Sequence, residues 1–415
     1  MPVRIKGTAT EDSRPCTHTA IIKNRRDNKP RERSRLMENT TYLTLGRSGL
    51  RVSPLCLGTM SFGTEWGWGT GEDASAAILD RYLDAGGNFL DTADMYTNGH
   101  SEEMVGKLVA ERKIRDKVVI ATKFNFSADP ANPNAGGNGR KNIYRALEAS
   151  LRRLGTDYID LYWLHAWDTV TPAEEVLSTL NDLVRAGKVR HIGLSDVPAW
   201  YVARFQTLAE KEGKERIAAL QLEYSLVERQ IEREHIPAAQ EFGIAVCPWS
   251  PLAGGFLTGR YTRSKDGFEG EGRFQITKSS DNPVFDKFTN RNWGILKTLE
   301  EVASDLGRPS AQVALNWVAT QPGVTCTLIG ATKLEQLNQN LAALGFVIPD
   351  NQRAKLDAAS RLPRVHPYMF FEPPMISMTF GRSTIRAWEP WRQVSVGKAG
   401  QEREPGQEPL AASAR

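Results

Sequence analysis

Cysteine and histidine are scarce in this chain, whose 415 residues include four cysteines and six histidines. Cys16, Cys56, Cys247 and Cys326 show no paired spacing, so we interpret them as free thiols of a reducing compartment. No two histidines have metal-ligand spacing beside a cluster of acids, which disfavours a metal-dependent hydrolase. The sequence therefore predicts neither a disulfide framework nor a metal site.

Long apolar runs are lacking as well. No stretch approaches the roughly 18 residues of a membrane span, and residues 1–30 lack the apolar centre of a signal peptide. With 40% hydrophobic and 25% charged residues, the composition is that of an ordinary globular protein. We therefore expect a cytoplasmic protein with no membrane partner.

Positive charge is concentrated at one end of the chain. Residues 1–36 contain ten Lys or Arg and four acids, and this +6 accounts for more than the whole formal charge of +4. A basic tail is typical of nucleic-acid binding or of a transit peptide. We interpret it instead as a disordered extension, because acids interrupt it and no amphipathic period is visible. The remainder is near −2 and suggests no nucleic-acid partner.

From residue 42 onward, short apolar runs alternate with amphipathic stretches. The runs are rich in Val, Ile and Leu without strict alternation, as in buried parallel strands. The expected strands are 55–58, 88–92, 118–123, 158–165, 191–195, 218–222, 244–249 and 325–329. Eight strands separated by helices predict an α/β fold, either a closed (β/α)₈ TIM barrel or a doubly wound open sheet.

Local signals refine this picture. Thr171-Pro172-Ala173-Glu174 resembles a capping box with Pro at the first helical position. Residues 42–45 and 50–52 predict an N-terminal β-hairpin. The stretch 251–291, after the seventh strand, is too long for a simple connection and predicts a lid loop. The domain boundaries we expect are 1–36 for the extension, 37–391 for the barrel and 392–415 for a disordered tail.

Polar residues stand at the carboxyl ends of six expected strands. They are Asp91, Lys123, His165, Ser195, Gln221 and Trp249, with Tyr96 five residues after the first. In barrels of this type the carboxyl ends of the strands carry the active site. One polar strand end means little, but six at a single rim predict a site.

Asp91, Tyr96, Lys123 and His165 suggest a mechanism. A Lys ammonium favours the phenolate of a nearby Tyr, and a carboxylate keeps that Lys charged. The group is suited to general acid catalysis of carbonyl reduction, with His165 orienting the carbonyl oxygen. Taken singly, each has a structural alternative, such as a buried Asp91–Lys123 ion pair.

The motifs along the chain closely resemble those of the aldo-keto reductases. They are Gly-Asn-Phe-Leu-Asp-Thr-Ala-Asp-Met-Tyr (87–96), Ala-Thr-Lys-Phe (121–124), Asp-Leu-Tyr-Trp-Leu-His (160–165), Gly-Lys-Val-Arg-His-Ile-Gly-Leu-Ser (187–195), Gln-Leu-Glu-Tyr-Ser-Leu (221–226), Pro-Trp-Ser-Pro-Leu-Ala-Gly-Gly-Phe-Leu-Thr-Gly-Arg-Tyr (248–261) and Ile-Gly-Ala-Thr-Lys-Leu-Glu-Gln-Leu (329–337). The resemblance runs from about residue 42 to 391. It implies a TIM-barrel oxidoreductase in which Tyr96 is the proton donor.

The resemblance also implies a nicotinamide cofactor site. Its residues would be Thr59, Met60, Asp91, Ser195, Asp196, Gln221, Trp249, Ser250, Pro251, Leu252, Ala253, Gly254, Arg260, Gly330, Thr332, Lys333, Gln336, Gln339 and Asn340. Trp249 would stack beneath the nicotinamide ring. No Gly-rich Rossmann fingerprint is visible, as in the family.

Three positions depart from the family pattern. Asp196 stands where many members have Asn, and Gly330 and Gln336 stand where NADPH-dependent members place Lys and Arg against the 2′-phosphate. Lys333 and Arg260 are alternative cations for that phosphate. We therefore expect NADP, with NAD as the alternative.

Trp66, Trp68, Phe124 and Trp167 are the expected substrate-pocket residues, because aromatic side chains form apolar pockets. Within the family the chain most resembles aryl-alcohol dehydrogenases, which implies aryl carbonyl or alcohol substrates. Motifs 248–261 and 329–337 also resemble potassium-channel β subunits, so an NADP-binding regulatory subunit is the alternative. Those proteins have Asn where this chain has His165, which favours an enzyme.

Overall fold

The computed structural model describes residues 40–265, 267–277, 282–381 and 383. The expected extension 1–36 and tail 392–415 lie outside this range. The chain divides into two compact units, the first reaching Leu362 and the second beginning at Pro363. In the second unit, short helices η6 (Tyr368–Phe371) and α12 (Met375–Phe380) are described. The rest of this section concerns the first unit.

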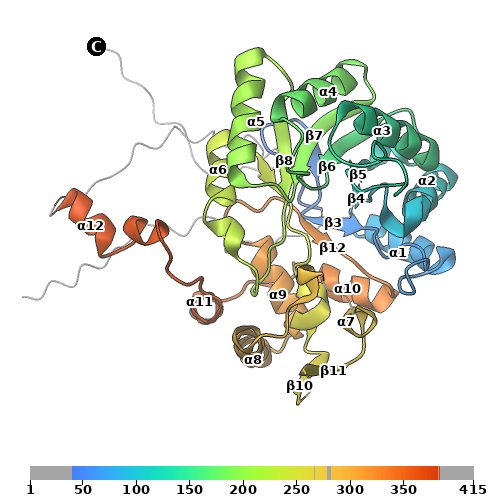
Figure 1. The fold of residues 1–415 in the computed structure, drawn as a ribbon. Helices are drawn as coiled ribbons and strands as arrows, with labels where there is room; N and C mark the ends of the chain where they lie inside the picture. Colours follow the sequence, from blue (N-terminus) through green and yellow to red (C-terminus); the bar gives the residue numbers. More distant parts are fainter. Residues whose placement is uncertain (1–39, 266, 278–281, 382, 384–415) are drawn as a thin grey trace, which may run out of the picture. The chain divides into compact units, whose positions relative to one another are not determined.

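The first unit is built on eight parallel strands, which Figure 1 shows ringed by helices. The strands are β3 (Leu55–Gly58), β4 (Phe89–Asp91), β5 (Val119–Phe124), β6 (Ile159–Leu164), β7 (Val189–Ser195), β8 (Ile217–Gln221), β9 (Ala245–Val246) and β12 (Thr327–Ile329). Neighbours in the chain pair with one another, and β12 returns to pair with β3. Backbone hydrogen bonds from Thr325 to Val246 and from Leu328 to Pro248 join the last edge. The prediction of a (β/α)₈ barrel is confirmed, and the open sheet is excluded.

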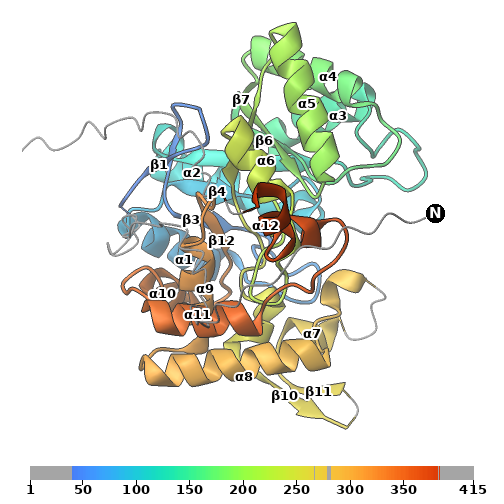
Figure 2. The ribbon, with the colours of Figure 1, turned by 90° about the vertical axis from the view of Figure 1, so that its left-hand side faces the viewer.

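Helices alternate with the strands along the chain. They are α1 (Glu72–Asp84), α2 (His100–Arg112), α3 (Arg140–Leu154), α4 (Ala173–Arg185), α5 (Ala199–Glu212), α6 (His235–Phe242), α8 (Asn290–Asp305), α9 (Ser310–Ala319), α10 (Leu334–Ala342) and α11 (Asp350–Ala359), with the short η1 (Tyr96–Gly99), η2 (Arg115–Lys117) and η3 (Gln230–Glu232). Helices α10 and α11 follow the last strand, β12. Figure 2 shows α8 and α11 side by side. Within the described ranges, no helix combines the length and apolar character needed to cross a bilayer.

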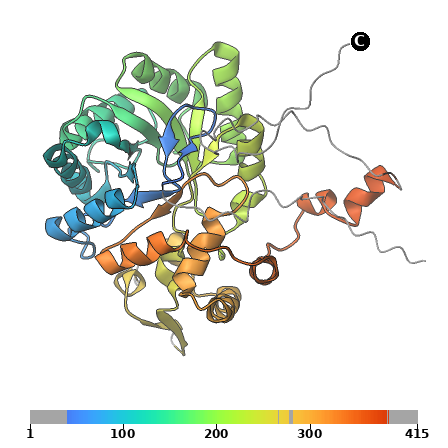
Figure 3. The same cartoon turned by 180° about the vertical axis from the view of Figure 1, so that it is seen from behind.

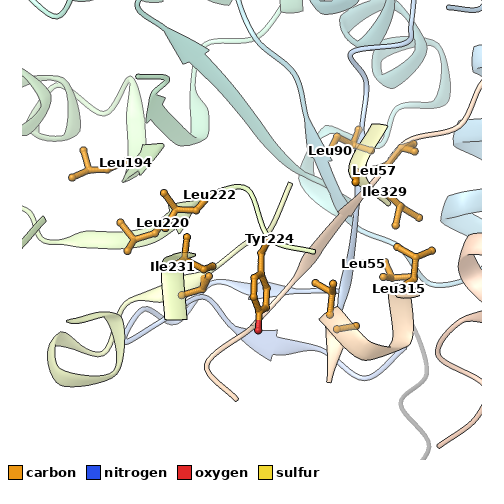
Figure 4. Packing of buried hydrophobic residues seen from close by; sticks show 14 of the residues in the cluster. Leu55, Leu57, Leu90, Leu194, Leu220, Leu222, Tyr224, Ile231, Leu315 and Ile329 are labelled. Carbon is orange, nitrogen blue, oxygen red and sulfur yellow. The ribbon is translucent and has the colours of Figure 1, made fainter. Parts of the chain in front are cut away.

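Each barrel strand buries both of its faces, which explains why its apolar runs do not alternate. Outward-facing residues pack against the helices, and Figure 4 shows Leu55 of β3 near Leu315 of α9 in this layer. Inward-facing residues such as Phe89, Ala121 and Trp163 form a separate buried cluster. Because side chains alternate along a strand, the direction of one residue fixes that of its neighbours.

The N-terminal hairpin is confirmed as β1 (Leu43–Thr44) paired with β2 (Arg51–Val52). Leu45 and Val52 are fully buried with the inward-facing cluster, and the Arg47 amide donates to the Gly243 carbonyl just before β9. The hairpin therefore covers the amino-terminal end of the barrel (Figure 3). This leaves the opposite end, where the polar residues lie, as the open mouth.

The long segment after β9 contains more structure than a loop. It holds η4 (Ala253–Thr258), an antiparallel hairpin of β10 (Tyr261–Ser264) and β11 (Gly267–Gly270), α7 (Arg273–Ile276) and η5 (Pro283–Phe285). The aromatic rings of Tyr261, Phe268, Phe274 and Phe288 pack together within it, with Phe268 stacked on Phe288 at 3.7 Å. A small apolar core thus orders this segment.

Two local expectations were wrong. The Thr171 hydroxyl donates to Asp168 Oδ2 at 2.5 Å, so it does not cap α4, whose N-cap is Pro172 without a side-chain hydrogen bond. The seventh barrel strand is shorter than 244–249, because Pro248 has no amide hydrogen to extend a regular ladder. Hydrogen bonds from Cys247 and Trp249 to β8 and its extension still hold this stretch in place.

Gly193 of β7 is required by the packing of the barrel interior. A methyl group at this position would lie 2.3 Å from the Trp163 ring. Gly193→Ala should therefore displace Trp163 and lower the free energy of unfolding by about 1–3 kcal/mol. Chemical denaturation measures the change.

The control for that variant is Gly294→Ala. Gly294 lies within α8, and a methyl group there meets nothing within 4 Å. This change should be neutral or stabilising by up to about 1 kcal/mol. Equal stability of the two variants would contradict the assigned role of Gly193.

Candidate active site

The polar residues at the barrel mouth occupy inward-facing positions of their strands. Asp91 follows inward-facing Phe89 by two residues, and Lys123 follows Ala121 in the same way. His165, Ser195, Gln221 and Trp249 also fall two residues after inward-facing positions of their strands. The alternation that packs the interior therefore also aims these side chains at a common centre.

Lys123 contacts most of the polar groups at this centre, and its side chain is fully buried. Its ammonium donates hydrogen bonds to Asp91 Oδ1, to the Thr92 carbonyl at 2.9 Å and to the Tyr96 hydroxyl at 3.1 Å. Burial by itself lowers the pKa of Lys123, but Asp91 and Tyr96 more than offset this and leave it raised. Lys123 therefore carries its charge at neutral pH.

The Asp91 carboxylate is held from two sides. While Oδ1 accepts from Lys123, Oδ2 accepts from Trp163 Nε1 at 2.9 Å and from Gln221 Nε2 at 2.9 Å. Donors to both oxygens fix the orientation of the carboxylate and compensate for its desolvation. Gln221, which the sequence associates with the cofactor, is thus also a support of Asp91.

Tyr96 begins η1, just past the end of β4. Thr97 and Asn98 follow it with left-handed backbone angles, and the Thr97 hydroxyl donates to the Phe62 carbonyl at 3.0 Å. Burial raises the pKa of Tyr96 above its usual value, and Lys123 offsets this only in part. The phenol is therefore protonated at neutral pH and able to donate its proton.

His165 lies beside Tyr96, with 5.9 Å between the ring centroids. Burial and then the charge of Lys123 hold the pKa of His165 well below its usual value, so the imidazole is neutral at pH 7. Within the described part of the chain, its buried Nδ1 has no hydrogen-bond partner. This neutral ring is available to a ligand at the mouth.

Aromatic residues form the wall of the mouth. The Trp66 ring meets Tyr96 at 6.2 Å and Trp68 at 5.7 Å. Trp167 packs instead against Trp200 at 5.3 Å and Tyr201 at 6.1 Å. The expected pocket residues thus fall into two groups on different loops.

Phe124 does not face the mouth, contrary to expectation. It follows inward-facing Lys123 by one residue, so it points outward, where it is fully buried against Tyr162 at 4.9 Å. Phe126, which sequence reasoning missed, is 42% exposed and meets the His165 ring at 4.8 Å. The alternation of side chains along the strand could have shown from the sequence that Phe124 does not face the pocket.

One part of the expected cofactor site lies after β7 and β9. Ser195 is buried at the end of β7, and the neighbouring Asp196 accepts a hydrogen bond from Trp249 Nε1 at 3.1 Å. Left-handed angles at Ser250, Ala253 and Gly254 wind the following chain into a tight turn around Pro251 and Leu252. Such turns gather backbone amides into concavities that bind anions. Arg260, exposed two residues past η4, adds a cation.

A second part lies after β12. Gln336 Oε1 accepts from the Thr332 amide at 2.8 Å, and Asn340 Nδ2 donates to the Gly330 carbonyl at 3.1 Å. Gln339 accepts from Gln312, while Lys333 is exposed at the N-cap of α10. A methyl group on Gly330 would meet nothing within 4 Å, so this position borders open space.

Thr59 and Met60 follow β3. The Thr59 hydroxyl and amide both donate to the Asp91 carbonyl, at 3.0 and 2.9 Å. Thr59 is fully buried, whereas Met60 is partly accessible. The half-buried Trp249, the turn 250–254 and the open space beside Gly330 together suit a nicotinamide dinucleotide. Among the described residues there is no metal-binding cluster of His, Cys, Asp or Glu.

The Asp91–Lys123 pair has a measurable structural role. Asp91→Asn leaves a buried ammonium without its carboxylate and should lower the free energy of unfolding by about 3–5 kcal/mol. Adding Lys123→Met should recover part of that loss. The control, Asp182→Asn, breaks an exposed pair with Arg140 and should cost about 1 kcal/mol or less. If the losses of unfolding free energy caused by Asp91→Asn and Lys123→Met simply add in the double variant, the two side chains are not coupled.

Several known proteins are similar in sequence to this chain. Norsolorinic acid reductase stcV of Emericella nidulans is 36% identical over 351 residues, which cover 82% of this chain and 87% of that protein. The uncharacterized oxidoreductase YrpG of Bacillus subtilis is 38% identical over 313 residues, covering 73% and 90%. An aryl-alcohol dehydrogenase (NADP(+)) of Phanerodontia chrysosporium is 34% identical over 339 residues, covering 78% and 86%.

The family model described as "Aldo/keto reductase family" matches residues 54–361. This match covers the barrel from β3 through α11. The chain therefore belongs to the aldo/keto reductase family and is an oxidoreductase of that family.

Proposed function

We propose that this protein interconverts aryl aldehydes or ketones and their alcohols with NADP(H), and that Tyr96 is its general acid. The observation that carries the proposal is the contact of one buried Lys123 ammonium with both Asp91 and the Tyr96 hydroxyl. A surface phenol would lack this arrangement. The neutral His165 beside Tyr96 adds a second hydrogen-bonding group at the same point.

Each of the four polar residues at the mouth has a separate role in the proposed carbonyl reduction. A nicotinamide cofactor bound at this mouth would supply the hydride that the carbonyl carbon accepts. Tyr96 donates its hydroxyl proton to the carbonyl oxygen, and the Lys123 charge 3.1 Å away stabilises the phenolate that remains. Asp91 keeps Lys123 charged and oriented. His165 donates a hydrogen bond from its neutral ring, which orients the carbonyl oxygen toward Tyr96.

The cofactor would lie across the strand ends of the barrel. Trp249 would offer a ring face to the nicotinamide, and its carboxamide would be bound by Ser195, Asp196 and Gln221, which meet at the ends of β7 and β8. The turn 250–254 and Arg260 would hold the pyrophosphate, and residues 330–340 would hold the adenosine. Lys333, exposed at the N-cap of α10, is the cation we assign to the 2′-phosphate.

The aryl preference is supported by the aromatic wall of Trp66, Trp68 and Phe126. Flat aromatic rings stack favourably on such side chains. Two relatives carry names that refer to aryl-alcohol dehydrogenase or norsolorinic acid reductase activity. Phe124 is omitted from this pocket because it faces the helices.

Tyr96→Phe tests the proton donor. Loss of the hydroxyl should lower the turnover of an aryl aldehyde at least about 100-fold, while NADPH affinity stays within about twofold. NADPH oxidation followed at 340 nm and cofactor titration measure the two effects. The control is Tyr144→Phe. Tyr144 lies on α3, outside the barrel mouth, and is 38% exposed, so this variant should keep full turnover. Near-normal turnover of Tyr96→Phe would remove it from the mechanism.

Lys333→Ala tests the cofactor assignment. Loss of the cation should raise the dissociation constant for NADPH about tenfold, or 1.4 kcal/mol, and leave that for NADH nearly unchanged. Lys297→Ala, an exposed lysine on α8, is the matched control. If Lys333→Ala weakens NADPH and NADH binding equally, Lys333 does not bind the 2′-phosphate. Equal affinity of the unmodified protein for NADPH and NADH would show the same.

A further inference from the structure

We propose that the Asp196 carboxylate compensates the positive charge of an oxidised nicotinamide ring, so that this protein binds NADP⁺ more tightly relative to NADPH than it would with Asn at this position. The inference rests on the proposed function, which places the cofactor at this mouth, and it gives Asp196 a role beyond hydrogen bonding to the carboxamide. Asp196 directly follows β7, at the position where many members of the family have Asn.

The backbone fixes Asp196 at the barrel mouth. Its amide donates to the Gln221 carbonyl at 3.3 Å, and its own carbonyl accepts from the Trp167 amide at 3.3 Å. Its φ of 45° lies in the left-handed region, which Asp and Asn adopt more readily than most other residues that carry a side chain. The backbone therefore accepts Asp and Asn alike, and the main difference between them at this position is the charge.

Asp196 contacts the ring on which the nicotinamide would stack. Its Oδ1 accepts a hydrogen bond from Trp249 Nε1 at 3.1 Å, so the carboxylate lies at the edge of the indole. A planar ring stacked on Trp249 would therefore have this carboxylate beside it. The hydrogen bond to a carboxylate also polarises the indole, and a polarised indole attracts a cation to its face more strongly.

The charge of Asp196 lacks a partner, since no ion pair among the residues that the structure describes includes it. Glu223, the other carboxylate near this point, is paired with Lys287 at 2.8 Å. Asp196 is exposed in the open mouth, where water solvates it. A dinucleotide lying over Trp249 would displace that water, and the carboxylate would then be stabilised by a positive charge on the ligand.

The oxidised form of the cofactor supplies this charge at the nicotinamide, whereas the reduced ring is neutral. Departure of a hydride, which is a proton with two electrons, leaves one positive charge on the ring. Asp196 would therefore favour bound NADP⁺ over bound NADPH. It would also stabilise the charge that develops while the carbonyl carbon accepts the hydride and Tyr96 gives its proton to the carbonyl oxygen.

The titration of Asp196 makes this preference depend on pH. Although water reaches Asp196, the surrounding barrel wall disfavours its charge and raises the pKa of the carboxyl to about 7. The hydrogen bond from Trp249 and the charge of Lys123 oppose this rise, and Glu223 adds to it. Tyr96, which also faces Asp196, has a raised pKa and stays protonated. Because only the ionised carboxylate favours NADP⁺, the preference should strengthen as the pH rises through this pKa.

The test is the ratio of the dissociation constant for NADP⁺ to that for NADPH, measured by calorimetric titration without substrate. Asp196→Asn should raise this ratio at least about tenfold, which is about 30 mV for a two-electron couple. Asn keeps an oxygen for Trp249 and for the carboxamide, so a role in hydrogen bonding alone would leave the ratio unchanged. NAD⁺ and NADH should show the same shift, because their nicotinamide rings are identical to those of NADP⁺ and NADPH.

Asp84→Asn is the matched control. Asp84 is exposed at the end of α1, which leads into the amino end of β4 and so lies opposite the mouth. This variant should leave the ratio unchanged. A second measurement uses the unmodified protein, in which the ratio should fall at least about threefold between about pH 6 and about pH 8. The 2′-phosphate titrates in both forms of the cofactor, so its effect cancels in the ratio.

Two results would overturn the inference. They are equal changes of the two dissociation constants in Asp196→Asn, and a ratio that does not vary with pH in the unmodified protein. Either result leaves the proposed function standing, because the cofactor is still bound. If the unmodified protein binds neither form of the cofactor, the proposed function and the inference that rests on it are both contradicted.

Discussion

The arrangement of the mouth depends on one buried charge, that of the Lys123 ammonium inside the barrel. An ammonium removed from water is tolerated only with an opposite charge and enough acceptors. Asp91 supplies the charge, and the Thr92 carbonyl and the Tyr96 hydroxyl complete the set of acceptors. The position of Tyr96 therefore follows from a requirement of folding as well as from chemistry.

The need to pair the buried Lys123 charge also determines contacts in the barrel core. Asp91 needs donors of its own, and Trp163 and Gln221 provide them from β6 and β8. Trp163 fits only because Gly193 on β7 has no side chain. Four strands thus cooperate to fix one carboxylate. The buried ion pair of Asp91 and Lys123 and the proposed active site therefore share the same contacts.

Much of this could be predicted from sequence because strand ends in a parallel barrel converge. The polar residues at positions 91, 123 and 165 end apolar runs, and alternation aims them inward. Phe124 was misjudged because proximity in sequence was given more weight than strand alternation. The order in residues 253–276 escaped prediction because it depends on aromatic contacts among distant residues, such as Phe268 with Phe288.

We propose that this mouth supports direct hydride transfer to a carbonyl carbon, with proton delivery by the protein. The most direct measurement uses NADPH deuterated at both C4 positions, an aryl aldehyde in ordinary water, and mass spectrometry of the alcohol. Direct hydride transfer predicts one deuterium on the carbinol carbon of every product molecule, which remains there while the hydroxyl proton exchanges with solvent. Product alcohol without deuterium, or tight NADPH binding with no alcohol formed from any aryl carbonyl, would contradict it.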